Sequence, residues 1–240
     1  MFIPYIGHKG KFSNFIIPNI PTDVSTYVEP FAGAFGIFFC LNIYNYQNTK
    51  FIYNDINHLN SNLFKQLTNP IFIDKLNISK STEELYYKIQ KEINSEIDDI
   101  DKAIHWLMLL CCSYSQYNII DGQYKGDIEF EIFKMKLKYE NKKLDRIEVY
   151  NSDYKDIILK YDSKSTFFYL DPPYRTKEHF YINHNFNDET HYELSQVLKN
   201  INGRFALSYY YFPEIDEWYK DCRIIKNKTL MGTEFLIMNY

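Results

Sequence analysis

The chain has 240 residues, of which 45% are hydrophobic and 24% charged, so it can bury a sizeable core and is neither disordered nor fibrous. Its 27 basic and 31 acidic side chains give a net charge of -4, so any nucleic-acid surface must be a local patch. The 4 cysteines include no C-x-x-C pair, which indicates neither a disulfide framework nor a structural zinc site.

The N-terminal segment does not have the pattern of an export signal. Pro4, His8, Lys9 and Lys11 interrupt the region where a signal peptide needs an unbroken apolar run. The longest apolar stretch, 31–41, is far shorter than the roughly 20 residues that span a bilayer. We therefore expect a cytoplasmic protein that is not secreted and does not enter a membrane.

Short β-rich runs alternate with amphipathic stretches, which is typical of an α/β protein with a mostly parallel sheet. The last two predicted strands are separated by residues 229–232, too few for a parallel crossover, so they should form an antiparallel hairpin at one edge. The predicted strands cover 26–30, 50–54, 147–151, 166–170, 204–208, 223–226 and 234–239. The predicted helices between them cover 36–46, 58–67, 154–160, 188–200 and 213–219.

The interval 57–146 between the second and third strands is far longer than an ordinary connection, so it must carry structure of its own. Residues 81–84 resemble a helix start, and 101–113 is apolar on at least one face. A loop rich in amides and turn formers, 115–126, follows. After it come the lysines at positions 134, 136, 138, 142 and 143. The sequence predicts a mainly helical insert.

The tetrapeptide Asp171-Pro172-Pro173-Tyr174 directly follows a predicted strand. Open α/β sheets bind ligands outside the carboxyl ends of their strands. The two prolines remove amide donors and leave carbonyl acceptors. Asp171 and the Pro172 carbonyl can accept from an exocyclic amine, and Tyr174 can stack on the ring that carries it. The alternative is an ordinary turn with an exposed Tyr174.

Two more segments fit a nucleoside-binding site. Gly33 lies in the loop 29–36 after the first strand, where glycine permits a sharp turn and close approach of a ligand. Asp55 ends the second strand, where an acidic residue typically binds ribose hydroxyls, although it could instead cap the next helix. A third segment, Pro4 to Lys11, would on its own be an ordinary basic N-terminal segment.

In this order the segments resemble the Dam-type DNA adenine-N6 methyltransferases, in the subgroup whose recognition insert precedes the catalytic tetrapeptide. The resemblance covers essentially the whole chain, because 232–240 is also similar to the family's last strand. It implies a Rossmann-like class I methyltransferase fold, with a seven-stranded mixed sheet whose last strand is antiparallel. The catalytic domain would comprise 1–56 and 147–240, and 57–146 would be the DNA target-recognition insert.

The resemblance also implies the reaction. S-adenosylmethionine would give its methyl group to N6 of an adenine flipped out of double-stranded DNA, leaving S-adenosylhomocysteine, without a metal. It implies a bacterial, phage or viral setting and admits a cognate restriction endonuclease as a partner. The oligomeric state is left open.

The resemblance implies three groups of site residues. The catalytic residues are Asp171, Pro172, Pro173 and Tyr174. The cofactor-binding residues are Tyr5, Lys9, Glu29, Phe31, Gly33, Asp55, Asp153, Tyr154 and Asp171. The DNA-contacting residues are Gln116, Asn118, Tyr124, Lys125, Lys134 and Lys136.

Physical chemistry supports several of these roles. Asp55 can bind the ribose diol, Lys9 can bind the methionine carboxylate, and Tyr154 can flank the adenine. Glu29 can orient the glycine loop through backbone amides instead of contacting the cofactor. The lysines after the loop fit phosphate contacts, with a solvated helix face as the alternative. Gln116 departs from the family, which usually has arginine two residues before the asparagine.

Three other functions remain open. The chain could be a non-catalytic nucleic-acid-binding protein with a methyltransferase shell, or an amino-methyltransferase acting on cytosine N4 or on RNA. A metal-dependent nuclease could use His179, His184 and His191, but their spacing fits no ligand helix well.

Overall fold

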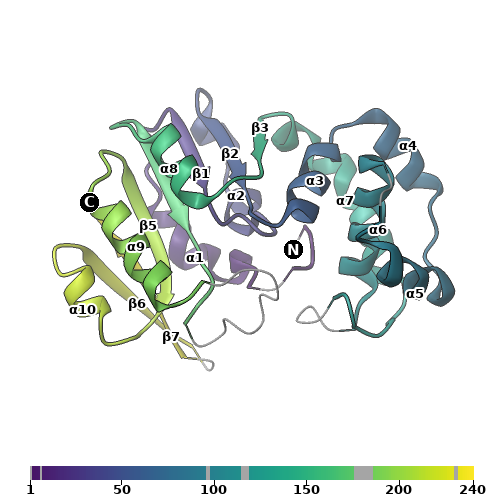
Figure 1. The fold of residues 1–240 in the computed structure, drawn as a ribbon. Coiled ribbons are helices and arrows are strands. Elements are labelled where there is room, and N and C mark those ends of the chain that lie inside the picture. The colour runs from purple at the N-terminus through teal and green to yellow at the C-terminus, as the bar shows by residue number, and fades with distance from the viewer. Residues whose placement is uncertain (1, 6, 96–97, 115–118, 176–185, 230–231) are drawn as a thin grey trace.

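The computed structural model describes residues 2–5, 7–95, 98–114, 119–175, 186–229 and 232–240, which form a twisted sheet flanked by helices and a helical lobe beside it (Figure 1). All seven predicted strands are confirmed. They are β1 (Thr26–Glu29), β2 (Lys50–Asn54), β3 (Ile147–Tyr150), β4 (Thr166–Leu170), β5 (Arg204–Tyr210), β6 (Arg223–Thr229) and β7 (Gly232–Met238).

The strand order β3-β2-β1-β4-β5-β7-β6 forms one sheet of mixed direction. The pairings from β3 to β5 are parallel, whereas β7 runs antiparallel to both β5 and β6. The predicted hairpin between β6 and β7 is confirmed, with Thr229 opposite Gly232. The chain winds outward from β1 to β3 and then returns to β4 on the other side of β1. The resulting switch point is where open α/β sheets bind ligands.

The described helices and 3-10 turns fall where connections are expected, with one exception. They are η1 (Lys9–Phe12), α1 (Ser13–Ile16), η2 (Ile17–Asn19), α2 (Gly36–Cys40), η3 (Ile43–Tyr46), α3 (His58–Gln66), α4 (Pro70–Ile78), α5 (Glu83–Glu92), α6 (Asp99–Cys112), α7 (Ile128–Leu144), α8 (Tyr154–Tyr161), α9 (Asp188–Lys199) and α10 (Ile215–Trp218). The prediction of one helix over 36–46 is wrong. Leu41 is extended, and the Asn42 side chain accepts from the Tyr44 amide and begins η3 instead.

The interval between β2 and β3 contains helices α3 to α7, as the sequence predicts for a mainly helical insert. Thr82 caps α5 and Asp98 caps α6 through their side chains. The central helix of the lobe is α6, in which Trp106 and Leu107 are among the buried residues. No described helix is both long enough and apolar enough to cross a bilayer.

Two hydrophobic cores cover the two faces of the sheet. One core joins Phe168 and Leu170 of β4 to side chains of α8, α9 and α10. The other contains Tyr27 and Phe51 from the sheet and continues into the lobe through α6 and α7. This second core is therefore shared by the sheet and the lobe.

Candidate functional site

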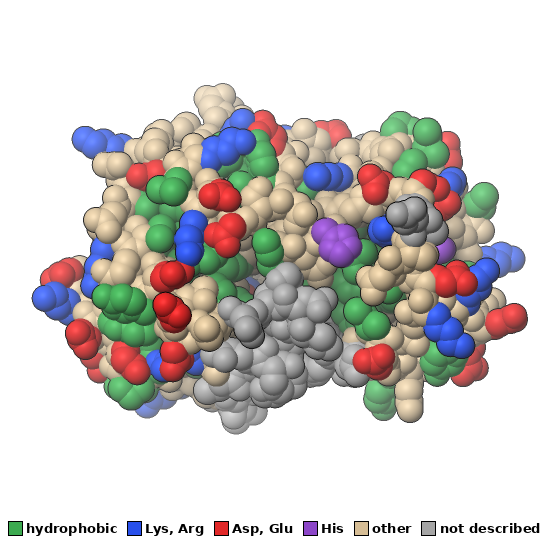
Figure 2. Space-filling model, in the orientation of Figure 1, with side chains coloured by type: hydrophobic (Ala, Val, Ile, Leu, Met, Phe, Trp, Pro, Cys, Tyr) green, Lys and Arg blue, Asp and Glu red, His purple; other side chains and the backbone are tan. Residues whose placement is uncertain are grey.

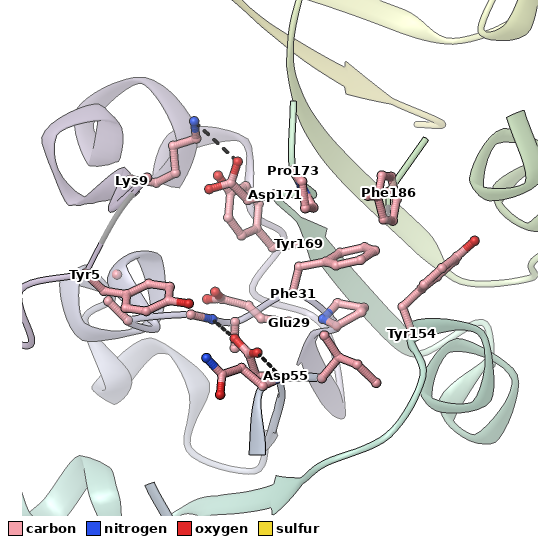
Figure 3. A pocket seen from close by; sticks show the side chains of 18 of the residues that line it. Tyr5, Lys9, Glu29, Phe31, Asp55, Tyr154, Tyr169, Asp171, Pro173 and Phe186 are labelled. Carbon is pink, nitrogen blue, oxygen red and sulfur yellow. Dashed lines mark hydrogen bonds and ion pairs between the residues drawn. The ribbon is translucent and has the colours of Figure 1, made fainter. Parts of the chain in front are cut away.

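A cavity of about 400 Å³ opens at the carboxyl ends of β1, β2 and β4, at the switch point of the sheet (Figure 3). Its walls come from the N-terminal segment and from the loops that follow these strands and β3. The structure brings together every residue that the resemblance assigns to cofactor binding. Those that line the cavity are Tyr5, Lys9, Glu29, Phe31, Gly33, Asp55, Asp153, Tyr154 and Asp171, together with Pro173 of the tetrapeptide.

Asp55 connects the β1–α2 loop to the start of α3. One carboxylate oxygen accepts from the Gly33 amide at 2.8 Å, and the other accepts from the Asn57 amide at 2.8 Å. Burial raises the pKa of Asp55 to about 6, although these hydrogen bonds act in the opposite direction. The alternative that Asp55 caps α3 is wrong, because the Asn57 side chain accepts from the Leu59 amide and is the cap.

Gly33 lies directly against an aromatic ring. Its φ of +49° is in the left-handed region, and a Cβ atom on it would lie 3.2 Å from the Tyr5 ring. Burial, with Asp55 nearby, raises the pKa of Tyr5, so its hydroxyl keeps its proton. Glycine thus lets the loop pass between Tyr5 and Asp55.

Glu29 lies buried at the end of β1, beneath the cavity. Its Oε1 atom accepts from the Tyr27 hydroxyl at 2.7 Å and from the Phe38 amide in the first turns of α2 at 3.2 Å. Burial raises the pKa of Glu29 to about 8, so the carboxyl is mostly neutral at pH 7. In this position Glu29 joins the strand to the helix that follows the glycine loop.

A buried ionic cluster, here the Lys9 cluster, comprises Lys9, Asp171, Tyr174 and Glu234. The Lys9 ammonium lies 3.3 Å from Asp171 Oδ1 and 3.2 Å from Glu234 Oε1, and it also donates to the Tyr174 hydroxyl. Burial alone would lower the pKa of Lys9, but the two carboxylates together raise it. Burial raises the pKa of Asp171 to about 6, although Lys9 acts in the opposite direction. Lys9 is therefore a charged lysine next to the tetrapeptide.

The tetrapeptide divides between the cavity and the interior. Asp171 and Pro173 line the cavity, whereas Tyr174 is only 8% exposed and packs edge to face on Tyr210 at 4.8 Å between ring centroids. The Tyr174 hydroxyl donates to Glu234 Oε1 at 2.6 Å. The alternative of a turn with an exposed Tyr174 is therefore wrong. Stacking of this ring on a substrate stays a prediction.

An aromatic wall closes the end of the cavity away from Lys9 (Figure 3). The Phe31 ring centroid lies 5.1 Å from that of Tyr154 and 5.5 Å from that of Phe186. Asp153 caps α8 by accepting from the Lys155 amide at 2.8 Å, which fixes the adjacent Tyr154 at this wall. A flat aromatic ligand fits such a wall, because rings pack well in offset and edge-to-face arrangements.

Sequence reasoning missed four residues of this region. Phe186 carries no motif, although an apolar residue just before an N-cap, here Asn187, was an available signal. Buried Asn54 donates to the Pro30 and Ser152 carbonyls and so joins two loops of the cavity. Glu234 was marked only by being a charged residue in an apolar strand. The fourth, His8, lines the cavity.

The position of the His8 ring predicts what happens when a methyl group is added to Gly36. A Cβ atom on Gly36 would lie 2.4 Å from His8 Nδ1, too close for the ring to stay in place. We expect Gly36→Ala to reduce the free energy of unfolding by about 1–3 kcal/mol, the usual range for overpacking. Urea denaturation measures the loss, and His8→Ala in the same chain should recover part of it. Equal losses in the single and double variants would contradict this packing.

The predicted DNA-contacting residues fall into two groups. Gln116 and Asn118 lie outside the described residues. Lys125 pairs with Glu129 at 2.9 Å, and Lys134 pairs with Glu131 at 2.7 Å. Lys136 lies on the same helix, α7, with a half-buried side chain. The Tyr124 ring packs against Tyr86, with 5.5 Å between centroids. Tyr124, Lys125, Lys134 and Lys136 belong to the lobe, and contact of any of the six residues with DNA stays a prediction.

With a net charge of -4, the expectation that any nucleic-acid surface is a local patch stays a prediction. On the face drawn in Figure 2, the basic side chains that are described are interspersed with acidic ones over both the sheet and the lobe. Two of the three histidines considered for a nuclease, His179 and His184, lie outside the described residues, and the third, His191, has its Nδ1 atom 2.7 Å from the Tyr209 hydroxyl. Within the described ranges no group of three His, Cys, Asp or Glu side chains could hold a metal ion.

Comparison with known proteins gives one family. The family model described as D12 class N6 adenine-specific DNA methyltransferase matches residues 5–233. The chain is 24% identical over 238 residues to the type II methyltransferase M.MjaIII of Methanocaldococcus jannaschii. This alignment covers 85% of this chain and 81% of the relative. The chain is 28% identical over 196 residues to the type II methyltransferase M.CviBI of Paramecium bursaria Chlorella virus NC1A, covering 77% and 73% respectively.

Proposed function

Because the chain belongs to the D12 class N6 adenine-specific DNA methyltransferases, we propose that it binds S-adenosylmethionine in the cavity and methylates an adenine flipped out of double-stranded DNA. The observation that carries this proposal is the place of Asp171. Its carboxylate stands at the carboxyl end of β4 and lines the same cavity as Asp55 and the glycine loop. An amine acceptor and a nucleoside-binding wall therefore share one site.

The cavity fits S-adenosylmethionine group by group. The aromatic wall of Phe31, Tyr154 and Phe186 suits the adenine ring. Asp55 Oδ2 accepts from the Gly33 amide and from Asn60 Nδ2 at 3.3 Å, whereas Oδ1 accepts from the Asn57 amide alone and keeps acceptor capacity for a ribose hydroxyl. Gly33 lines the cavity without a side chain, which permits the methionine moiety to approach the backbone closely. The predicted pairing of Lys9 with the methionine carboxylate competes with its ion pairs to Asp171 and Glu234.

The residues around Asp171 would activate a weak nucleophile. When bound, S-adenosylmethionine supplies a methyl group on an electrophilic sulfonium. The lone pair of adenine N6 is delocalised into the ring. Hydrogen bonds from the amine to Asp171 and to the Pro172 carbonyl favour a more tetrahedral nitrogen whose lone pair is free. Asp171, with a pKa raised to about 6 by burial, can also take the proton that N6 loses. Positioning and electrostatics are then the main catalytic effects.

The substrate base must leave the duplex to reach Asp171, because the cavity lies at the strand ends of a buried sheet. Flipping costs a few kcal/mol, part of which stacking on Tyr174 would return. We propose that the insert 57–146 binds the DNA duplex. Its lysines on α7 would bind phosphates, and the loop before α7 would contact base edges.

A cofactor-binding prediction follows from Asp55. We expect Asp55→Ala to weaken S-adenosylmethionine binding by about 1–3 kcal/mol, because the ribose hydroxyls lose an acceptor and the Gly33 amide loses its hydrogen bond to Asp55. Titration calorimetry without DNA and with a chelator measures this loss. Asp23→Ala, which removes an exposed ion pair with Arg204, is the control and should leave the affinity unchanged. Equal affinity in wild type and Asp55→Ala would contradict the assignment.

The test of the reaction is product analysis. Purified protein is incubated with methyl-labelled S-adenosylmethionine and with duplex DNA, single-stranded DNA or RNA, and the digested nucleosides are separated by mass spectrometry. We expect label in N6-methyladenine from duplex DNA. Label in N4-methylcytosine or only in RNA would favour the other amino-methyltransferases. Cofactor binding without any transfer would favour the non-catalytic alternative.

The relatives named as type II methyltransferases suggest a cognate restriction endonuclease, so we propose a fixed recognition sequence. Glutamine pairs naturally with adenine, whereas arginine makes the commonest contact to guanine. With Gln116 in place of the family's arginine, we expect a site other than GATC, or selectivity relaxed by roughly tenfold at one flanking guanine, since a bidentate contact gives about 1–3 kcal/mol. Methylation rates on duplexes altered one base pair at a time measure this. Strict GATC methylation unaffected by Gln116→Ala would contradict it.

A further inference from the structure

One buried carboxylate in the Lys9 cluster has no part in the mechanism above. We propose that Glu234 is a positioning residue for methyl transfer, which holds the Lys9 ammonium and the Tyr174 hydroxyl so that the Asp171 carboxylate stays open to the substrate amine. This inference rests on the proposed function and deepens it. Glu234 lies on β7, opposite Tyr210 of β5, and its side chain is fully buried.

The geometry gives Glu234 the larger share of the donors. Its Oε1 atom accepts from the Tyr174 hydroxyl at 2.6 Å and lies 3.2 Å from the Lys9 ammonium. The Lys9 ammonium is about as far from Asp171, at 3.3 Å, and both distances exceed the roughly 2.7–2.9 Å of a strong charge-assisted hydrogen bond, so the Tyr174 hydroxyl is what distinguishes Glu234. Asp171 therefore keeps acceptor capacity on the side that faces the cavity.

Asp171 and Glu234 differ in exposure, which indicates different roles. The Asp171 side chain is 19% exposed and lines the cavity, whereas that of Glu234 is 0% exposed and does not line it. Glu234 therefore cannot contact the substrate directly. It can act only through Lys9 and Tyr174, which reach it from segments far away in the chain.

A purely structural role would not call for a carboxylate at this position. The residues that follow, 235–238, are all apolar and buried, and an apolar side chain would continue that pattern. Burying an ionised carboxylate costs several kcal/mol unless it is well paired. Glu234 is paired at one oxygen only, since Oε2 is buried and has no hydrogen-bond partner in the described part of the chain. Such an exception in a native structure calls for an explanation, and a role in catalysis is one of the recognised ones.

Removing the Glu234 charge would change the surroundings of Asp171 in a definite direction. The titratable groups that face Asp171 are Lys9 from η1, Glu234 from β7, Glu29 from β1, Tyr169 from β4 and Tyr174 from its own turn. Of these, Glu234 raises the pKa of Asp171 and Lys9 lowers it. Without the Glu234 charge, Lys9 would pair with Asp171 alone. The pKa of Asp171 would fall, and one acceptor site would be lost to the amine.

The test compares the pH dependence of kcat in Glu234→Gln with that in wild type. Wild-type kcat should fall below about pH 6, as Asp171 becomes protonated. In Glu234→Gln we expect this acid limb to move to lower pH by about one unit. We also expect kcat at neutral pH to fall roughly tenfold through lost positioning, with the affinity for S-adenosylmethionine retained. Glu234→Asp keeps the charge and should bring the acid limb back toward wild type.

Glu148→Gln is the matched control. Glu148 also lies on a strand, pairs with a lysine (Lys50, 2.6 Å) and accepts from tyrosine hydroxyls, but it is on the edge strand β3. It should leave both kcat and the acid limb unchanged.

Two results would overturn the proposal. One is an acid limb in Glu234→Gln that coincides with wild type. The other is failure of both Glu234 variants to fold, which would give the residue a structural role. If wild type itself methylates no adenine, the proposed function fails instead, so the two failures are distinguishable.

Discussion

Asp171→Asn is expected to lower methyl transfer by at least about 10²-fold, the usual scale for deleting a positioned polar group, while the protein stays folded. The carboxylate at this strand end lines the cavity and accepts the substrate amine in the proposed mechanism. An amide there can turn its NH₂ group toward the amine and so present a donor where an acceptor is needed. Transfer of labelled methyl groups to duplex DNA, at saturating cofactor, measures the loss.

The control for Asp171→Asn is the same change at an exposed site. Asp23→Asn loses only an ion pair with Arg204 on the surface and should keep wild-type turnover. Near wild-type turnover in Asp171→Asn would remove Asp171 from the reaction. An unfolded variant, seen by circular dichroism, would instead show that the residue serves the fold.

Lys9→Met is expected to have the second large effect, a loss of about 3–5 kcal/mol in the free energy of unfolding together with loss of activity. Lys9 is the cation between two carboxylates, Asp171 and Glu234, and its removal leaves both of them in the interior without a counter-charge. Urea denaturation at pH 7 measures the difference from wild type.

The pH dependence of this loss has a definite sign. Burial raises the pKa of Asp171 to about 6 even with Lys9 present, above the ordinary value near 3.9, and removal of Lys9 would raise it further. A carboxyl with a raised pKa destabilises the folded state when ionised, and this destabilisation is relieved as pH falls through the raised value. The loss in Lys9→Met should therefore be largest near pH 7 and smaller below pH 6.

Lys50→Met is the control for this charge removal. Lys50 pairs with Glu148 at 2.6 Å, but both side chains are 45% exposed, so the pair should contribute no more than about 1 kcal/mol. A loss in Lys9→Met as small as that in Lys50→Met, or one that does not change with pH, would contradict the account of the Lys9 cluster.

The parts of the fold that the sequence predicts are those fixed by local patterns. The strand Thr166–Leu170 is an apolar run buried along its whole length, and Asp171 follows it directly, so both the strand and its place at the cavity could be predicted. The predicted helix over 36–46 was wrong because a cap at Asn42 competes with helix continuation, and apolar periodicity alone does not register that competition.

The parts that could not be predicted depend on contacts between distant segments. Lys9 and Tyr174 are 165 residues apart, and Glu234 is a further 60 residues beyond Tyr174, yet the three share hydrogen bonds. The sequence marks Lys9 and Tyr174 through their motifs but gives no sign that Glu234 joins them. Phe186 reaches the aromatic wall in the same way, from a segment without a motif.

Mapping modified bases in living cells shows whether the chain methylates adenine N6 at a fixed DNA sequence. The protein and its Asp171→Asn variant are expressed in a host that lacks DNA methylation, and the genome is read by single-molecule sequencing. We expect N6-methyladenine at one recurring sequence in cells with the wild-type protein and none with the variant. Unmodified adenine in cells that contain folded, cofactor-binding wild-type protein, or modification of cytosine instead, would contradict it.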